Sequence, residues 1–135
     1  MIVVTGGVAA GKKSFCERQF HKKEGEDWCD AGSASIEELM RADWIYNLHQ
    51  LVHRAVLGEI SWEMLEMLEH ALTAQTQSRP VVVTDEIGCG IVPMDASKRA
   101  WREAAGRLAC RLAENAREVW LVTCGIGTCI RREER

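Results

Sequence analysis

A glycine-rich turn follows the first apolar run of the chain. Ile2–Thr5 is β-branched and apolar on both faces, which favours a central parallel strand, and residues 12–23 have the pattern of a helix. Between them, residues 6–12 spell G-x-x-x-x-G-K, the context of a phosphate-binding loop. The alternative is a glycine-rich turn that holds a lysine by chance. The residues predicted to bind nucleotide are Gly6, Gly7, Val8, Ala9, Ala10, Gly11, Lys12, Lys13 and Ser14.

The residue types in this turn suit the binding of a triphosphate. Successive backbone amides point inward to phosphate oxygens, glycines permit the close approach, and the helix amino terminus adds a positive dipole end. Lys12 would reach the β- and γ-phosphates of ATP or GTP. We therefore predict that Lys12 both binds nucleotide and acts in catalysis.

The residue after Lys12 departs from the usual motif. This position ordinarily holds Ser or Thr, whose hydroxyl binds Mg²⁺, whereas this chain has Lys13. A lysine ammonium has no acceptor, and Ser14 is displaced by about 100° around the helix. Nucleotide binding is therefore better supported than metal-assisted transfer, and we predict that binding depends little on Mg²⁺.

Two carboxylates follow the clearest buried strand, Val81–Thr84. Asp85 and Glu86 are the candidate Mg²⁺ ligands, because a carboxylate at such a strand end holds the metal or orients the nucleophile. Glu86 is also the candidate catalytic carboxylate. The alternative is that these acidic residues only mark where the strand reaches solvent.

The middle of the chain is predicted to be helical. Ser35 and Glu38 form a capping-box pattern, after which apolar residues recur on one helix face as far as Ala55. Gly58 ends that helix, and Ser61 caps the next one.

Further strands and helices are expected on either side of this region. A short strand is predicted near Trp28–Cys29, a long helix from Asp95 or Ser97, and a last strand at 119–123. The charged tail from Arg131 is expected to be frayed. Strands that alternate with helices predict one α/β domain over the chain, with a mostly parallel sheet of four or five strands flanked by helices.

Composition excludes several functional classes. The net charge of −3 gives no support for a nucleic-acid-binding face, and no apolar run approaches the roughly 20 residues of a membrane span. The amino terminus has no basic region before its first glycines, so we expect a cytoplasmic protein without a signal peptide. The six cysteines contain no C-x-x-C pair and are expected to be free thiols.

Three segments resemble the adenosylcobinamide kinase / adenosylcobinamide-phosphate guanylyltransferase family. Residues 85–93, DEIGCGIVP, are similar to its Asn-Glu-Val-Gly-x-Gly-Ile-Val-Pro segment. Residues 99–108 resemble its arginine-containing helix, and residues 113–125 resemble its last strand. The paired glycines at 6 and 7 also match. The resemblance covers residues 1 to 20 and 80 to 131.

This resemblance implies a P-loop NTPase-like (RecA-like) fold and a nucleotide-dependent kinase of cobalamin biosynthesis. The acceptor would be the hydroxyl on the aminopropanol arm of a cobinamide-type corrinoid, with ATP or GTP as donor. Three departures are Lys13, Asp85 in place of the usual Asn, and a shorter middle at residues 24 to 79. That middle carries the family's guanylylated histidine, so we predict weak or absent guanylyltransferase activity.

His49 and His53 lie four residues apart and share a helix face. They are candidates for a guanylylated or substrate-binding pair; the alternative is a pair of solvated side chains beside the core. Asp30 is predicted either to point toward the phosphates or to cap the turn after it.

Two other functions stay open at this point. One is a non-catalytic P-loop nucleotide-binding protein that regulates or scaffolds cobalamin assembly, which Lys13 and the short middle favour. The other is a P-loop kinase for a different small alcohol. The choice between ATP and GTP and the formation of a homo-oligomer are also open.

Overall fold

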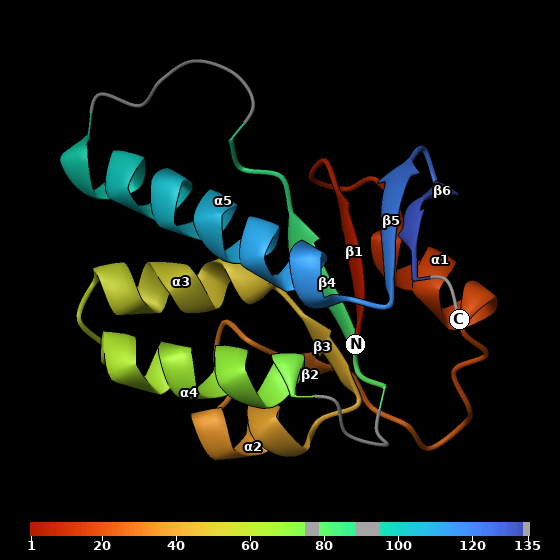
Figure 1. The fold of residues 1–135 in the computed structure, drawn as a ribbon, viewed down its shortest axis with the longest axis horizontal. Helices are drawn as coiled ribbons and strands as arrows, with labels where there is room; N and C mark the ends of the chain where they lie inside the picture. The colour runs from red at the N-terminus through yellow and green to blue at the C-terminus, as the bar shows by residue number, and fades with distance from the viewer. Residues whose placement is uncertain (75–78, 89–94, 134–135) are drawn as a thin grey trace.

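The protein folds as a six-stranded sheet with helices on both faces, seen in a computed structural model that describes residues 1–74, 79–88 and 95–133 (Figure 1). The strand order is β2-β3-β4-β1-β5-β6, and every pairing is parallel except β5 with β6. The strands are β1 (Ile2–Gly6), β2 (Cys29–Asp30), β3 (Trp44–Tyr46), β4 (Val81–Asp85), β5 (Glu118–Thr123) and β6 (Ile126–Arg132). The helices are α1 (Lys12–Gln19), α2 (Ile36–Arg41), α3 (Leu48–Val56), α4 (Trp62–Thr73) and α5 (Ala96–Asn115).

The predicted fold class is confirmed, because the sheet is mostly parallel and flanked by helices. The predicted caps at Ser35 and Ser61 are confirmed, since their side chains accept amide hydrogen bonds at the starts of α2 and α4. The predicted long helix is α5, and the side chain of Asp95 caps its start. Most of segment 85–93, which resembles the cobinamide kinase family, lies outside the described residues, because these stop at Gly88 and resume at Asp95.

The predicted long helix between Ser35 and Gly58 is wrong. It is divided into α2 and α3 by strand β3, which pairs in parallel with β4 through Trp44 opposite Val81. Aromatic and β-branched side chains suit a buried strand, and this tertiary pairing outweighs the local helical pattern. Asn47 then takes a left-handed conformation, with φ of 58°, at the start of α3.

The expected frayed tail from Arg131 is wrong for residues 131 and 132, which are the end of strand β6. Strand β6, which was not predicted, covers residues 126–132 and pairs antiparallel with β5 at the edge of the sheet. Alternate β6 residues pack inward, and Arg132 forms an ion pair of 2.9 Å with Glu118 across the two strands. The sheet therefore has one strand more than the upper number predicted.

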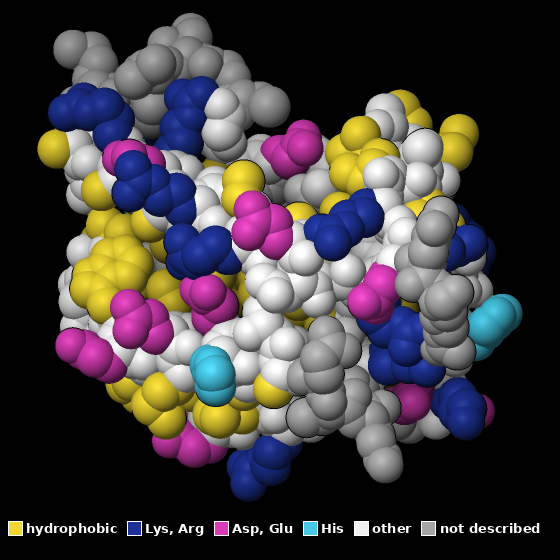
Figure 2. All heavy atoms as spheres, in the orientation of Figure 1, with side chains coloured by type: hydrophobic (Ala, Val, Ile, Leu, Met, Phe, Trp, Pro, Cys, Tyr) yellow, Lys and Arg dark blue, Asp and Glu magenta, His cyan; other side chains and the backbone are white. Residues whose placement is uncertain are grey.

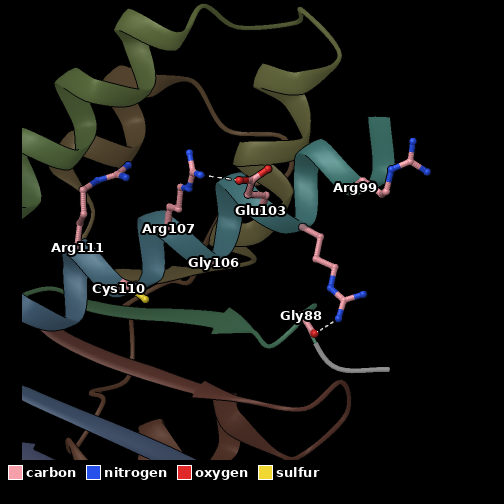
Figure 3. Close-up of a pocket in the computed structure, with 8 residues that line it drawn as sticks. Gly88, Arg99, Glu103, Gly106, Arg107, Cys110 and Arg111 are labelled. Carbon is pink, nitrogen blue, oxygen red and sulfur yellow. Dashed lines mark hydrogen bonds and ion pairs between the residues drawn. The ribbon is translucent and has the colours of Figure 1, made fainter. Parts of the chain in front are cut away.

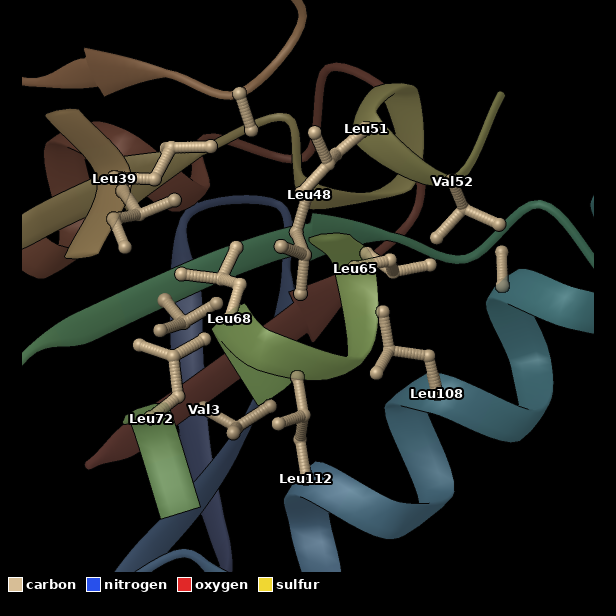
Figure 4. Close-up of a cluster of buried hydrophobic side chains, with 14 of the residues drawn as sticks. Val3, Leu39, Leu48, Leu51, Val52, Leu65, Leu68, Leu72, Leu108 and Leu112 are labelled. Atoms are coloured by element: carbon tan, nitrogen blue, oxygen red, sulfur yellow. The ribbon is translucent and has the colours of Figure 1, made fainter. Parts of the chain in front are cut away.

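Two apolar cores lie on the two faces of the sheet. Figure 4 shows the larger, in which leucines of α3, α4 and α5 converge with Val3 of β1. The smaller joins Phe15 and Cys16 of α1 to Val4, Val83 and Trp120 of the sheet. Because β1, β3 and β4 run in parallel, their carboxyl ends meet at one edge, which is where ligands bind in sheets of this kind.

Candidate nucleotide-binding site

The glycine-rich loop joins β1 to α1 and is braced by the turn between β5 and β6. The amide of Gly125 donates to the carbonyl of Ala10 at 2.7 Å. Gly11 has a φ of 84°, and a Cβ added there would lie 3.2 Å from the Cα of Gly125. Both the conformation and the close approach therefore require glycine at position 11. The first-turn amides of α1, which follow it, have no intrahelical acceptor and are available to a ligand.

Lys12 folds back over the loop. Its side chain is only 6% exposed, and Nζ lies 2.5 Å from the carbonyl oxygen of Gly7 and 2.6 Å from Oδ1 of Asp85. The strand register explains this meeting, because Gly6 at the end of β1 pairs with Asp85 at the end of β4. The predicted lysine and one predicted carboxylate thus come together from distant parts of the sequence.

A cavity of about 310 Å³ opens beside this ion pair. Its walls are the loop and helix residues from Ala9 to Ser14, with Tyr46, Asn47, Val83 and Asp85. Tyr46 and Asn47 are site residues that the sequence prediction missed, because it placed them inside a helix. The signal was the aromatic and β-branched triplet of β3, followed by an asparagine that tolerates the left-handed region.

Lys13 also lines the cavity, but its ammonium lies on an aromatic wall. Nζ is 3.9 Å from the ring centroid of Tyr46 and 5.6 Å from that of Trp28. A cation at this distance over an aromatic ring is attracted by the ring's quadrupole. The residue that stands in the place of the usual hydroxyl is therefore held by contacts of its own.

His49 is buried behind Asp85, so the interpretation of it as a solvated side chain is wrong. It is 4% exposed, Nδ1 accepts the backbone N–H of Asp85 at 3.1 Å, and Nε2 lies 3.4 Å from Oδ2 of Asp85. An acceptor Nδ1 places the proton of the neutral ring on Nε2, which faces the carboxylate. His49 therefore fixes the carboxylate that pairs with Lys12.

Burial, opposed by the nearby charge of Asp85, lowers the pKa of His49. The unfolded chain then binds a proton near pH 6.5, whereas the folded chain binds it only at a lower pH. We expect the free energy of unfolding to fall as the pH drops below about 6.5. Urea denaturation from about pH 7.5 to 5 should show a smaller decline in His49→Asn, whose amide oxygen can still accept the Asp85 N–H. Equal declines in the two proteins would contradict this assignment.

His53 does not reach the cavity, although it shares α3 with His49. Its ring stacks on Trp101 of α5 with centroids 4.5 Å apart, and the indole N–H of Trp101 donates to the carbonyl of His49 at 2.6 Å. Trp101 therefore ties α3 to α5. His49 contacts Asp85 and His53 stacks on Trp101, and a role for the two histidines in substrate binding or guanylylation stays a prediction.

Asp30 caps the turn that follows it and also approaches the site. Its Oδ1 accepts from the amide of Gly32 at 2.8 Å and from Nδ2 of Asn47 at 3.1 Å. Burial opposes ionisation, but these hydrogen bonds, the Tyr46 hydroxyl and the charge of Lys13 together lower the pKa of Asp30. Asp30 therefore provides a fixed negative charge behind the aromatic wall.

The backbone amide of Glu86 donates to the carbonyl of Gly6, the first residue of the loop, at 2.9 Å, but the Glu86 side chain does not line the loop cavity. This exposed side chain lines a second, largely apolar cavity of about 360 Å³, formed with α5, β1 and β5. Asp85 borders both cavities and is the carboxylate that pairs with Lys12. A catalytic role for Glu86 stays a prediction.

A third cavity, of about 600 Å³, lies along the outer side of α5 (Figure 3). Arg107 pairs with Glu103 one turn away, and Arg102 donates to the carbonyl of Gly88. The arginine-containing segment that resembles the cobinamide kinase family thus lines its own groove. Figure 2 shows that Lys and Arg side chains are interspersed with Asp and Glu over the visible face.

The residues present do not fit the usual magnesium site of P-loop enzymes. Lys13 replaces the hydroxyl, both oxygens of Asp85 face nitrogen groups of Lys12 and His49, and Glu86 is outside the cavity. The predicted pairing of Asp85 with Glu86 around Mg²⁺ is therefore not favoured by their placement. Among the described residues, no group of three or more His, Cys, Asp or Glu side chains could hold a metal ion.

The parallel sheet, the glycine-rich loop at the carboxyl end of β1 and the lysine that begins α1 together define a P-loop α/β protein. The sequence profile of the cobinamide kinase / cobinamide phosphate guanyltransferase family, CobU, matches residues 42–130. This is more than half of the chain, and the chain belongs to that family.

Two similar proteins are both named bifunctional adenosylcobalamin biosynthesis protein CobU. The one from Escherichia coli (strain K12) is 41% identical over 76 residues, which cover 49% of this chain and 42% of that protein. The one from Salmonella typhimurium (strain LT2) is 50% identical over 54 residues, which cover 40% of this chain and 30% of that protein. The matched part thus spans less than half the length of either relative.

None of the helices in the described residues is both long and apolar enough to cross a membrane.

Proposed function

We propose that the chain binds a nucleoside triphosphate in the P-loop cavity and transfers its γ-phosphoryl group to a cobinamide. The acceptor is the hydroxyl on the aminopropanol arm of adenosylcobinamide or a similar corrinoid. The main support is the position of Lys12, a buried ammonium at the mouth of a glycine-rich loop. Membership of the cobinamide kinase family supports the choice of acceptor.

Different residues of the cavity would contribute different parts of phosphoryl transfer. The loop amides and Lys12 stabilise the negative charge on the transferred group, for which Lys12 exchanges the Gly7 carbonyl for phosphate oxygens. Asp85 is on the same wall, so its carboxylate can accept a hydrogen bond from the attacking hydroxyl. His49 holds that carboxylate in place.

The direct test supplies ATP or GTP with adenosylcobinamide and follows the corrinoid by mass spectrometry. We expect a product that carries one added phosphoryl group, formed by the wild-type protein. Lys12→Ala, the matched inactive variant, should form little of it. Failure of the folded wild-type protein to form product with either nucleotide would reject the kinase.

A non-catalytic nucleotide-binding protein is the second candidate function. Lys13 in place of the metal-binding hydroxyl favours it, as does the shorter middle of the chain at residues 24 to 79. In that case the protein would bind triphosphate in the same cavity without turnover of cobinamide, and its role would be to regulate or scaffold cobalamin assembly. Binding and turnover measured on one preparation separate the two functions.

We expect guanylyl transfer to the protein to be weak or absent. His49 is buried, and both of its ring nitrogens face Asp85, so the ring is poorly placed to attack a nucleotide phosphorus. Incubation with labelled GTP followed by denaturing electrophoresis measures the label on the chain. A strong acid-labile label that disappears in His49→Ala would contradict this expectation and restore the second activity.

A further inference from the structure

We propose that the Lys13 ammonium, held on the ring of Tyr46, is a resident cation for the triphosphate, which this chain therefore binds without Mg²⁺. The inference rests on the proposed nucleotide binding and concerns how the same cavity balances phosphate charge. The residues of the cavity do not fit a magnesium ion. Lys13 occupies the motif position of the metal-binding hydroxyl and lines the cavity itself.

Aromatic contacts give the Lys13 ammonium a defined position. Nζ lies 3.9 Å from the centroid of Tyr46, and the Trp28 ring packs edge-on against Tyr46 with centroids 6.0 Å apart. Trp28 in turn packs edge-on against Trp44 of β3 at 5.3 Å. Tyr46 is thus supported by other rings, and it makes a firm platform at the cavity wall.

The charge around Lys13 suits a retained cation. The Asp30 carboxylate lies near enough to stabilise a positive charge at Lys13. It accepts hydrogen bonds from the Gly32 amide, from Asn47 and from the Tyr46 hydroxyl. An ammonium group offers three donors, which can bind phosphate oxygens directly. A divalent ion at the same place would be repelled by the ammonium, since two close cations raise each other's energy.

The first experiment measures the affinity for a non-hydrolysable GTP analogue by calorimetry, in EDTA and in excess Mg²⁺. We expect the wild-type protein to bind with similar affinity in both conditions. Lys13→Met, which keeps length but loses charge, should bind at least about tenfold more weakly in EDTA. Lys23→Met, the same change at an exposed lysine outside the cavity, should match the wild type.

A second pair of variants tests the platform. Tyr46→Phe keeps the ring beneath the ammonium and should retain the affinity measured in EDTA, whereas Tyr46→Leu should lose several-fold. Thermal unfolding of each variant shows whether it is folded. Equal affinities for folded Tyr46→Phe and Tyr46→Leu would contradict the role of the ring.

The hydroxyl variants decide between the ammonium and a metal. Lys13→Ser restores the usual ligand and should make binding depend on Mg²⁺. Ser14→Ala tests whether the neighbouring hydroxyl, which also lines the cavity, holds a metal in the wild-type protein. Wild-type binding only in Mg²⁺, or an Mg²⁺ effect that Ser14→Ala abolishes, would overturn the resident cation and leave nucleotide binding intact. Failure to bind in both conditions would overturn both proposals.

Discussion

Lys12→Ala is expected to weaken the binding of a nucleoside triphosphate by about 1–3 kcal/mol, the range for loss of a charge-assisted partner. In the free protein, Lys12 is bound to Gly7 and Asp85, and both contacts lie at the edge of the loop that would receive the phosphates. The substitution also removes charge stabilisation from the transferred group, so turnover should fall further than affinity does. Titration calorimetry measures the affinity.

A matched control removes a lysine away from the site. Lys23→Ala, at an exposed position after α1, should bind as the wild type does. Because Lys12 is buried and paired with Asp85, thermal unfolding must show that Lys12→Ala is folded before its affinity is interpreted. Unchanged affinity in the folded variant would contradict the assignment of the loop.

Phe15→Ala is expected to lower the free energy of unfolding by about 3–5 kcal/mol, the usual cost of removing a buried phenylalanine. Phe15 lies in α1, directly after the loop, and its ring centroid is 5.4 Å from that of Trp120 in β5. Gly127 of β6 makes room for it, because a Cβ added there would lie 2.1 Å from the Phe15 ring. Gly127→Ala should therefore cost about 1–3 kcal/mol through overpacking.

A double-mutant cycle tests this contact. If Gly127 is required only for the Phe15 ring, Gly127→Ala should cost much less when Phe15 is already alanine. Urea denaturation of the four proteins gives the coupling free energy. If the two losses in the free energy of unfolding are additive, the two residues do not share this space, and β6 is not needed to position α1.

Some features were predictable because they depend on residues close in sequence. The loop at residues 6–12 carries its chemistry in glycine spacing and one lysine, and strand Val81–Thr84 is a continuous β-branched run. The carboxylate of Asp85 comes immediately after that run. The helix caps at Ser35 and Ser61 are local too, since each side chain accepts the amide three residues further on.

Other features depend on contacts distant in sequence. Strand β3 has three residues and exists because Trp44 and Ile45 pair with β4, some 37 positions away in the chain. The place of His49 against Asp85 follows from that strand, so the prediction of a solvated histidine was wrong with it. Strand β6 was missed because its exposed residues alternate with Gly127 and Cys129, which look unlike a core strand until Phe15 is in place.

The most direct test of the proposed site is an experimental structure of the protein with a non-hydrolysable GTP analogue at saturating concentration. We expect the phosphates against the amides of residues 7–12, with Lys12 turned from the Gly7 carbonyl to a phosphate oxygen. Asp85 and His49 should keep their contact. A nucleotide bound elsewhere, with Lys12 still on Gly7 and Asp85, would contradict the account.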